Sequence, residues 1–172
     1  MNEQKRFFKI FGAWNDEGEE AWLSQMAQRG WYLVRPALGF YPFVQGEPKN
    51  IVYRLDYKSS DKDMAEYVQL FADAGWQHVG AMGGWQYFRK EAAEGESPEI
   101  YTDNTSKVQK YQRVMMLLVI FLPIFLITLS RSQEHASVFM DVVKVIHAGL
   151  LVVYVYAMVR LMLRIQQLKK HS

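Results

Sequence analysis

The sequence predicts an α+β protein: a duplicated strand-helix-strand-strand soluble domain, folded as a two-layer sandwich, followed by a two-helix transmembrane hairpin. Two observations predict this fold. Residues 6–45 and 51–90 repeat one pattern of strands and helices, and two stretches near the C-terminus are apolar around the whole helical circumference. The expected segments are a cytoplasmic domain at 1–90, a linker at 91–110, the hairpin at 111–164 and a basic cytoplasmic tail at 165–172.

The repeat becomes visible when the chain is shifted by 45 residues. The Gly-Trp pair at 30–31 then falls on the pair at 75–76, and Phe8 falls on Tyr53. In each copy a short alternating strand precedes an amphipathic helix with an acidic start, and two further strands follow. The strands are expected at 7–11, 31–35, 40–44, 51–57, 76–81 and 85–89, and the helices at 17–29 and 62–74. We expect an antiparallel or mixed sheet with both helices on one side and pseudo-two-fold symmetry.

Glycines stand where the repeat needs turns. Gly30 and Gly75 follow the two helices, where a residue in the left-handed conformation commonly ends a helix. Gly39 and the pair Gly83-Gly84 separate the strands of the two hairpins.

Charge divides the chain into two unlike parts. Residues 1–110 contain 13 Lys and Arg against 16 Asp and Glu, a net charge of −3, whereas residues 111–172 contain 7 against 2, a net charge of +5. The positive charge therefore flanks the membrane segments, and direct binding of nucleic acid is not expected. The absence of cysteine excludes disulfides, thiol nucleophiles and cysteine-ligated metals.

Two uncharged stretches, Val114 to Ser130 and Val145 to Val159, predict membrane-spanning helices at 112–131 and 142–163. Seven basic residues lie near the start of the first span and the end of the second, and two lie near the turn between them. The positive-inside rule therefore places both termini in the cytoplasm. The N-terminus lacks the long apolar run of a signal peptide. We therefore expect a multi-pass protein of the cell membrane with a cytoplasmic domain.

Asp141, Lys144 and His147 are spaced to share one helix face that enters the membrane from outside. Polar groups at that depth form a candidate intramembrane polar face for sensing protons or a ligand. The alternative is that they end a short helix near the outer headgroups and hydrogen-bond within the hairpin.

Aromatic residues are abundant in the soluble domain, which holds all five Trp. Those at matched positions of the repeat are expected in the core. Others, together with Arg54 and Asp56, form a candidate interaction or ligand surface. The alternative for these two charged residues is a surface ion pair on one strand face. The candidate surface residues are Trp14, Trp22, Tyr41, Arg54, Asp56, Tyr57 and Tyr87.

Catalytic patterns are not found in the sequence. The four histidines lack metal-ligand spacing, and there is no nucleophile elbow or phosphate-binding loop. The acidic pairs Glu19-Glu20 and Asp61-Asp63 fall at helix starts, where the helix dipole stabilises carboxylates. We expect no enzyme activity, no catalytic residues, no cofactor and no metal.

The soluble domain resembles the bacterial membrane family called domain of unknown function 2812. The resemblance is carried by EEAWLSQMAQRGWYL, YPFVQGEPKNIVYRLDY, YVQLFADAGWQHV, GGWQYFRK and EIYTDNTSK, and it covers residues 6–113. It implies a bacterial cytoplasmic membrane and frequent pairing with a PadR-like transcription regulator, and it implies no catalytic residues. The residues that belong to the family pattern are Trp22, Leu23, Met26, Gly30, Trp31, Tyr53, Arg54, Asp56, Tyr57, Gly75 and Trp76.

Two functions are favoured by the sequence over a third, a transporter subunit or small pore, for which two helices offer few polar lining residues. The first is a membrane-anchored cytoplasmic module for sensing and protein interaction, with a protein partner such as the transcription regulator. The second is a small-molecule-binding module with an aromatic cleft between the repeats, because duplicated strand-helix-strand-strand units resemble the drug-binding family related to gyrase inhibitory protein. An apolar ligand is the candidate partner of the second function.

Overall fold

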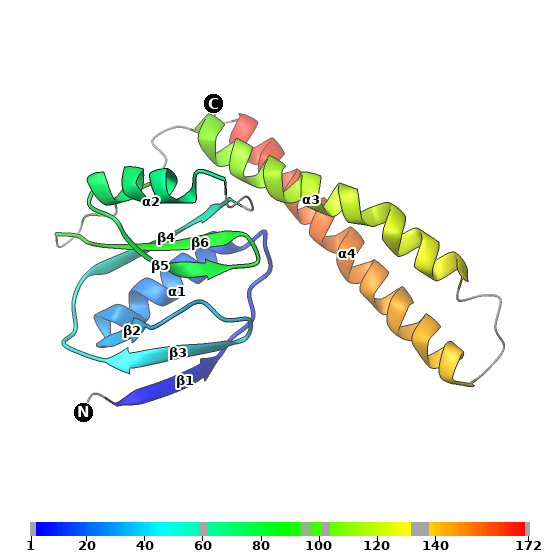
Figure 1. Cartoon of the computed structure of the whole chain (residues 1–172), viewed down its shortest axis with the longest axis horizontal. Coiled ribbons are helices and arrows are strands. Elements are labelled where there is room, and N and C mark those ends of the chain that lie inside the picture. Colours follow the sequence, from blue (N-terminus) through cyan, green and yellow to red (C-terminus); the bar gives the residue numbers. More distant parts are fainter. Residues whose placement is uncertain are drawn as a thin grey trace. The chain divides into compact units, whose positions relative to one another are not determined.

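The computed structural model describes residues 3–58, 62–93, 96, 98–100, 104–131 and 138–170 (Figure 1). The chain divides into two compact units, Met1–Thr102 and Asp103–Ser172. The elements of the first unit are β1 (Gln4–Phe8), α1 (Asp16–Gln28), β2 (Trp31–Leu33), β3 (Phe40–Gln45), β4 (Ile51–Tyr57), α2 (Met64–Asp73), β5 (Gln77–Met82) and β6 (Trp85–Glu91). Those of the second unit are α3 (Asn104–Arg131) and α4 (Val138–Lys170).

Each repeat forms its own antiparallel sheet of three strands. The first sheet has the order β1-β3-β2, and the second has the order β4-β6-β5. Phe8 of β1 lies opposite Phe40 of β3, and Tyr57 of β4 lies opposite Trp85 of β6. The predicted α+β class and antiparallel pairing are therefore confirmed.

Helix α1 packs against both sheets, and α2 lies on the far face of the second sheet (Figure 1). Tyr53 of β4 belongs to the core around α1, whereas its neighbour Val52 packs against α2. Because successive residues of a strand point to opposite faces, the two helices lie on opposite faces of the second sheet. The core around α1 consists of Leu23, Met26, Ala27, Leu33, Tyr41, Phe43, Ile51, Tyr53, Leu55 and Tyr87.

The expectation of one sheet with both helices on one side is therefore wrong. The physical reason is that α1 lies along the free edge of β4 and binds its backbone N–H groups through the side chains of Glu20 and Ser24. A strand whose edge is already satisfied in this way cannot join the first sheet to the second.

The repeat has two offsets rather than one. The hairpin strands follow the expected shift of 45, since Phe40 corresponds to Trp85, but the first strands follow a shift of 49, since Phe8 corresponds to Tyr57. The match of Phe8 with Tyr53 is therefore wrong. Most of the difference arises in the helices, because α1 has 13 residues and α2 has 10. The same offset explains why the first strand begins at Gln4 rather than at residue 7.

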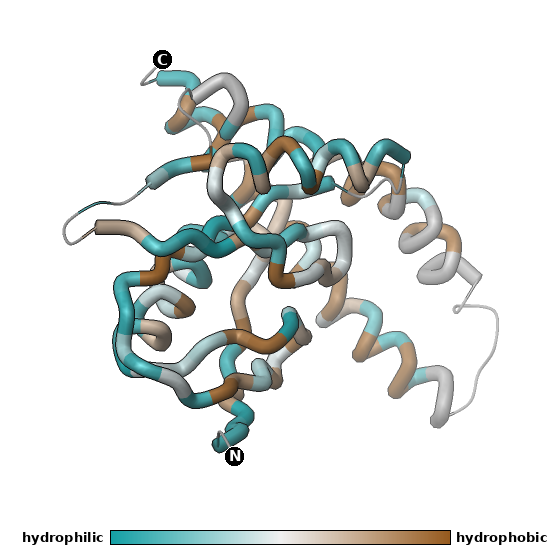
Figure 2. Tube along the Cα trace, turned by 60° about the vertical axis from the view of Figure 1, so that its left-hand side comes forward, coloured by the Kyte–Doolittle hydropathy of each residue, from teal (hydrophilic) through white to brown (hydrophobic). Residues whose placement is uncertain are grey.

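The second unit consists of α3 and α4, which lie side by side. The Tyr154 hydroxyl of α4 donates a hydrogen bond to the Leu118 carbonyl of α3. One described helix, Asp141–Lys170 within α4, is long and apolar enough to cross a membrane. Figure 2 shows hydrophobic residues recurring along the helices of the chain. The other expected span, 112–131, falls within α3; its passage through a membrane stays a prediction, and residues 132–137 lie outside the described part of the chain.

Candidate functional site

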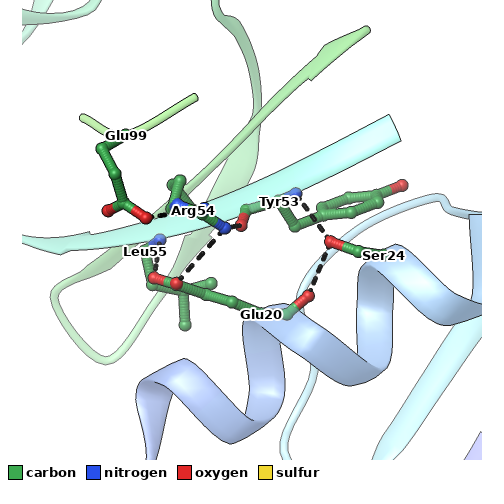
Figure 3. A network of polar contacts seen from close by, with 6 residues as sticks. All are labelled: Glu20, Ser24, Tyr53, Arg54, Leu55 and Glu99. Carbon is green, nitrogen blue, oxygen red and sulfur yellow. Dashed lines mark hydrogen bonds and ion pairs between the residues drawn. The ribbon is translucent and has the colours of Figure 1, made fainter. Parts of the chain in front are cut away.

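A polar seam runs along α1 where this helix meets the edge of β4 (Figure 3). One Glu20 carboxylate oxygen accepts a hydrogen bond from the Leu55 backbone N–H at 2.8 Å, and the Ser24 hydroxyl oxygen accepts one from the Tyr53 N–H at 3.0 Å. The Ser24 hydroxyl in turn donates to the Glu20 backbone carbonyl at 2.8 Å. The seam thus gives two edge N–H groups the partners that a further strand would otherwise supply.

Arg54 extends this seam beyond the helix. Its guanidinium lies 3.7 Å from the second Glu20 oxygen and 2.8 Å from a Glu99 carboxylate oxygen, and it donates to the Tyr53 carbonyl at 2.8 Å. The planar guanidinium can reach all three groups because its donors fan out in one plane. Arg54 therefore joins the helix, the strand and the segment that follows β6.

A second buried carboxylate, Glu19, stands at the junction of the two sheets. It accepts hydrogen bonds from the Tyr41 hydroxyl of the first sheet at 2.9 Å and from the Tyr87 hydroxyl of the second at 2.7 Å. Burial raises the pKa of Glu19. The hydrogen bonds from Tyr87 and Tyr41 lower this pKa in part, and the nearby charge of Asp16 raises it. Glu19 therefore holds its proton to a higher pH than an exposed glutamate does.

The two tyrosines are fixed as neutral donors. Burial, followed by the charge of Glu19, raises the pKa of both Tyr41 and Tyr87 well above that of a free phenol. Both side chains are almost completely buried, so neither contributes to an exposed aromatic surface. Their place in the candidate surface is corrected to a place inside the core, where their hydroxyl groups need the partner that Glu19 supplies.

Asp56 and Tyr57 are also buried. Asp56 accepts a hydrogen bond from the Tyr67 hydroxyl of α2 at 2.8 Å and another from the Tyr57 N–H at 2.7 Å. The Tyr57 ring packs edge-on against Trp85. A surface ion pair between Arg54 and Asp56 is therefore not the arrangement found: Arg54 binds Glu20 and Glu99, and Asp56 holds α2 against the second sheet.

The remaining candidates of the soluble domain, Trp14 and Trp22, are half-buried. Trp22 packs edge-on against Tyr41 and Phe43, with ring centroids 5.0 and 5.6 Å apart, and the Lys9 ammonium lies 5.1 Å from its ring. Trp22 therefore packs against the core around α1.

A groove of about 600 Å³ lies between the repeats. Five charged side chains contribute to its lining, and two of them, Lys49 and Glu91, form an ion pair of 3.3 Å. The residues that line it are Tyr32, Val44, Glu47, Lys49, Ile51, Gly75, Gln77, Arg89, Lys90 and Glu91. Of the aromatic residues considered for a cleft between the repeats, Tyr32 lines this groove, whereas Trp14, Trp22, Tyr41, Tyr57 and Tyr87 do not.

The residues of the candidate intramembrane polar face lie at the start of α4. The Lys144 ammonium forms an ion pair of 3.2 Å with the Asp141 carboxylate, as expected for residues three apart on a helix. His147, one turn further on, is half-buried.

Comparison with protein families matches residues 15–122 to the family described as protein of unknown function DUF2812. The chain belongs to the DUF2812 family. The match includes both repeats of this DUF2812 protein from α1 onward and the first part of α3. No curated protein and no solved structure matched the chain.

Sequence reasoning missed the roles of Glu19, Glu20 and Ser24 in this DUF2812 protein. It interpreted the two glutamates as acids at a helix start that the helix dipole stabilises, yet both side chains are buried. The available signal was spacing. Glu19 and Glu20 precede Leu23 by four and three residues and therefore share its buried face.

Proposed function

We propose that this DUF2812 protein is a membrane-anchored module in which α3 and α4 form a two-helix transmembrane hairpin and the duplicated domain serves sensing and protein interaction in the cytoplasm. The observation that carries the proposal is the surface of α4. Large apolar side chains are exposed on the faces of this helix that do not contact α3, among them Val145, Ile146, Val152 and Val153. A helix that is apolar all round needs lipid or protein around it, and the described chain supplies α3 on one side only.

The charge distribution supports a topology with both termini in the cytoplasm. Basic residues flank the ends of the helix pair that lie away from the turn, and the positive-inside rule puts that side in the cytoplasm. The duplicated domain then lies on the same side as a transcription regulator, which is the class of partner proposed from the family resemblance.

The absence of cysteine makes the topology directly measurable. Single cysteines at Glu3, Asp141 and Lys169 would be labelled in intact cells with a membrane-impermeant maleimide. We expect labelling of Asp141→Cys in intact cells, and labelling of Glu3→Cys and Lys169→Cys only after permeabilisation. Labelling of all three before permeabilisation would contradict the hairpin, and labelling of only the two terminal positions would contradict its proposed orientation.

A second candidate function rests on the groove between the repeats. Basic groups from Lys49, Arg89 and Lys90 and acidic groups from Glu47 and Glu91 line it, so the ligand it fits is small and polar rather than apolar. Thermal stabilisation of the full chain in detergent by zwitterionic or anionic metabolites, abolished by Arg89→Ala, would favour this function. Binding of an isolated regulator without such stabilisation would favour the interaction module.

A further inference from the structure

One end of the first sheet carries a cluster of exposed apolar side chains. We call it the strand-end patch, and it consists of Phe8, Ile10, Val34, Leu38 and Phe40. Leu38 is 79% exposed, Ile10 69%, Phe8 63% and Phe40 58%. Contiguous exposed apolar side chains on a folded domain usually mark a surface that meets a partner or a membrane.

The strand-end patch is continuous across two segments that are far apart in sequence. The Phe8 and Phe40 rings pack with centroids 4.9 Å apart, and the Lys9 N–H donates to the Gly39 carbonyl at 2.8 Å. A Cβ on Gly39 would lie 3.3 Å from the Phe8 ring and 4.0 Å from an Ile10 side-chain carbon. Phe8 and Ile10 therefore cover Gly39, and the loops after β1 and before β3 form one surface.

The corresponding end of the sheet in the second repeat is buried. The counterparts of Phe8 and Phe40 are Tyr57 and Trp85, which also pack ring against ring. Tyr57, however, is only 3% exposed, and Trp85 packs against the core around α1. At the same end of the first sheet, no described helix or strand of this unit covers Phe8 and Phe40, and both rings are exposed.

Charge sets this end apart from the rest of the domain. Residues 6–14 and 33–41, which surround this end, contain Arg6, Lys9 and Arg35 and no acidic residue, a charge of +3. Because residues 1–110 carry −3 in total, the rest of them carry −6. The strand-end patch is therefore the basic, apolar end of an otherwise acidic domain.

We infer that the strand-end patch docks onto the anionic surface of the bilayer, with its apolar side chains at the boundary of headgroups and acyl chains and its basic side chains on lipid phosphates. The inference rests on the proposed membrane anchor, which brings the domain to the bilayer. An anionic surface repels the acidic remainder of the domain and attracts this end. A symmetric contact between two copies would bring two basic ends together, which disfavours a second copy as the occupant.

The docking can be measured with the full chain in lipid nanodiscs. A polarity-sensitive dye on Leu38→Cys would be monitored for emission shift and for quenching by iodide, in discs of neutral lipid and in discs with about one-third anionic lipid. We expect a blue shift and loss of iodide quenching in anionic discs, reversed at high salt because docking is electrostatic. Arg6→Gln or Arg35→Gln should each lower the docked-to-undocked ratio about fivefold.

Two further labelled positions serve as controls. Leu70→Cys on α2 is a matched control, because Leu70 is also a leucine of similar exposure, 67%, but lies on an acidic helix of the same domain. Val152→Cys on α4 reports whether the anchor is in lipid. A shielded Val152 position together with equal iodide quenching at Leu38 and Leu70 in anionic discs would overturn the docking alone, whereas a quenched Val152 position would overturn the anchor and the docking with it. Shielding of Leu38 that is equal in neutral discs and grows with protein density would identify a protein contact and would also overturn the proposal.

Discussion

Glu19 is the residue on which the joining of the two sheets depends. Its carboxylate accepts from one tyrosine of each sheet, so a single side chain of α1 connects β3 to β6. The folded protein binds the Glu19 proton more tightly than the unfolded chain does, because burial raises this pKa. Stability from this source is therefore fully present below the unfolded pKa of about 4.5. It decreases as pH rises from there to the raised value, and stays constant above it.

Glu19→Gln should remove this pH dependence. The amide oxygen still accepts from a tyrosine hydroxyl but carries no charge to desolvate, so the free energy of unfolding near neutral pH should be unchanged or higher. The measurement is urea unfolding of the full chain in detergent between pH 4 and 8, followed by fluorescence of the tryptophans, all of which lie in the first unit. Glu17→Gln, an exposed neighbour on the same helix, is the control and should keep the wild-type slope. A wild-type slope in Glu19→Gln would contradict the assignment.

At the level of single residues, hydropathy and repeat position predicted much of the core but not its polar members. Trp76 and Leu33 are buried, as strands with apolar alternation require. Buried Tyr41, Asp56 and Tyr87 form hydrogen bonds to residues 11 to 68 positions away, and no local pattern encodes such pairings.

At the scale of elements, the hairpin between β5 and β6 shows how closely one turn is fitted to a neighbouring strand. Gly83 and Gly84 both have positive φ, 58° and 87°, as a two-residue turn of this kind requires. A Cβ on Gly84 would lie 2.8 Å from the Tyr57 ring, whereas a Cβ on Gly83 would meet nothing within 4 Å.

Gly84→Ala should therefore destabilise the domain more than Gly83→Ala. Each substitution places an L-residue in the left-handed region at a cost of about 1–2 kcal/mol, and the clash with the buried Tyr57 ring adds to the loss at Gly84. Chemical denaturation of the two variants side by side measures the difference. Equal losses would show that the Tyr57 ring moves freely. The pair is matched because both glycines belong to the same turn.

The element boundaries were largely predictable, because helix starts, Gly-Trp ends and strand alternation are local signals. The strand expected at 51–57 is found there, and the helix expected at 17–29 is found at Asp16–Gln28. The separation of the sheets was not predictable, since it depends on the side chains of Glu20 and Ser24 reaching the edge of a strand about 30 residues further along the chain.

At the scale of the whole molecule, the exposed apolar surface of α4 is the basis of the proposed membrane anchor. Val152→Arg should reduce recovery in the membrane fraction, because an arginine near the middle of a spanning helix costs about 3 kcal/mol on insertion. The measurement compares membrane and soluble fractions after carbonate washing. Leu70→Arg, which adds the same charge at an exposed leucine of α2, should leave recovery unchanged. Equal recovery of the two variants would argue against α4 as an anchor.

The position of α1 also bears on the order in which this protein is made. The core around α1 includes residues of β4 and β6, so the helix is fully packed only once these two strands have left the ribosome. A nascent chain that ends before Glu91 therefore exposes Leu23 and Met26 to chaperones, and release of the apolar helices that follow begins only after the first unit has all of its parts. The proposed membrane helices therefore leave the ribosome only after every strand and helix of the first unit.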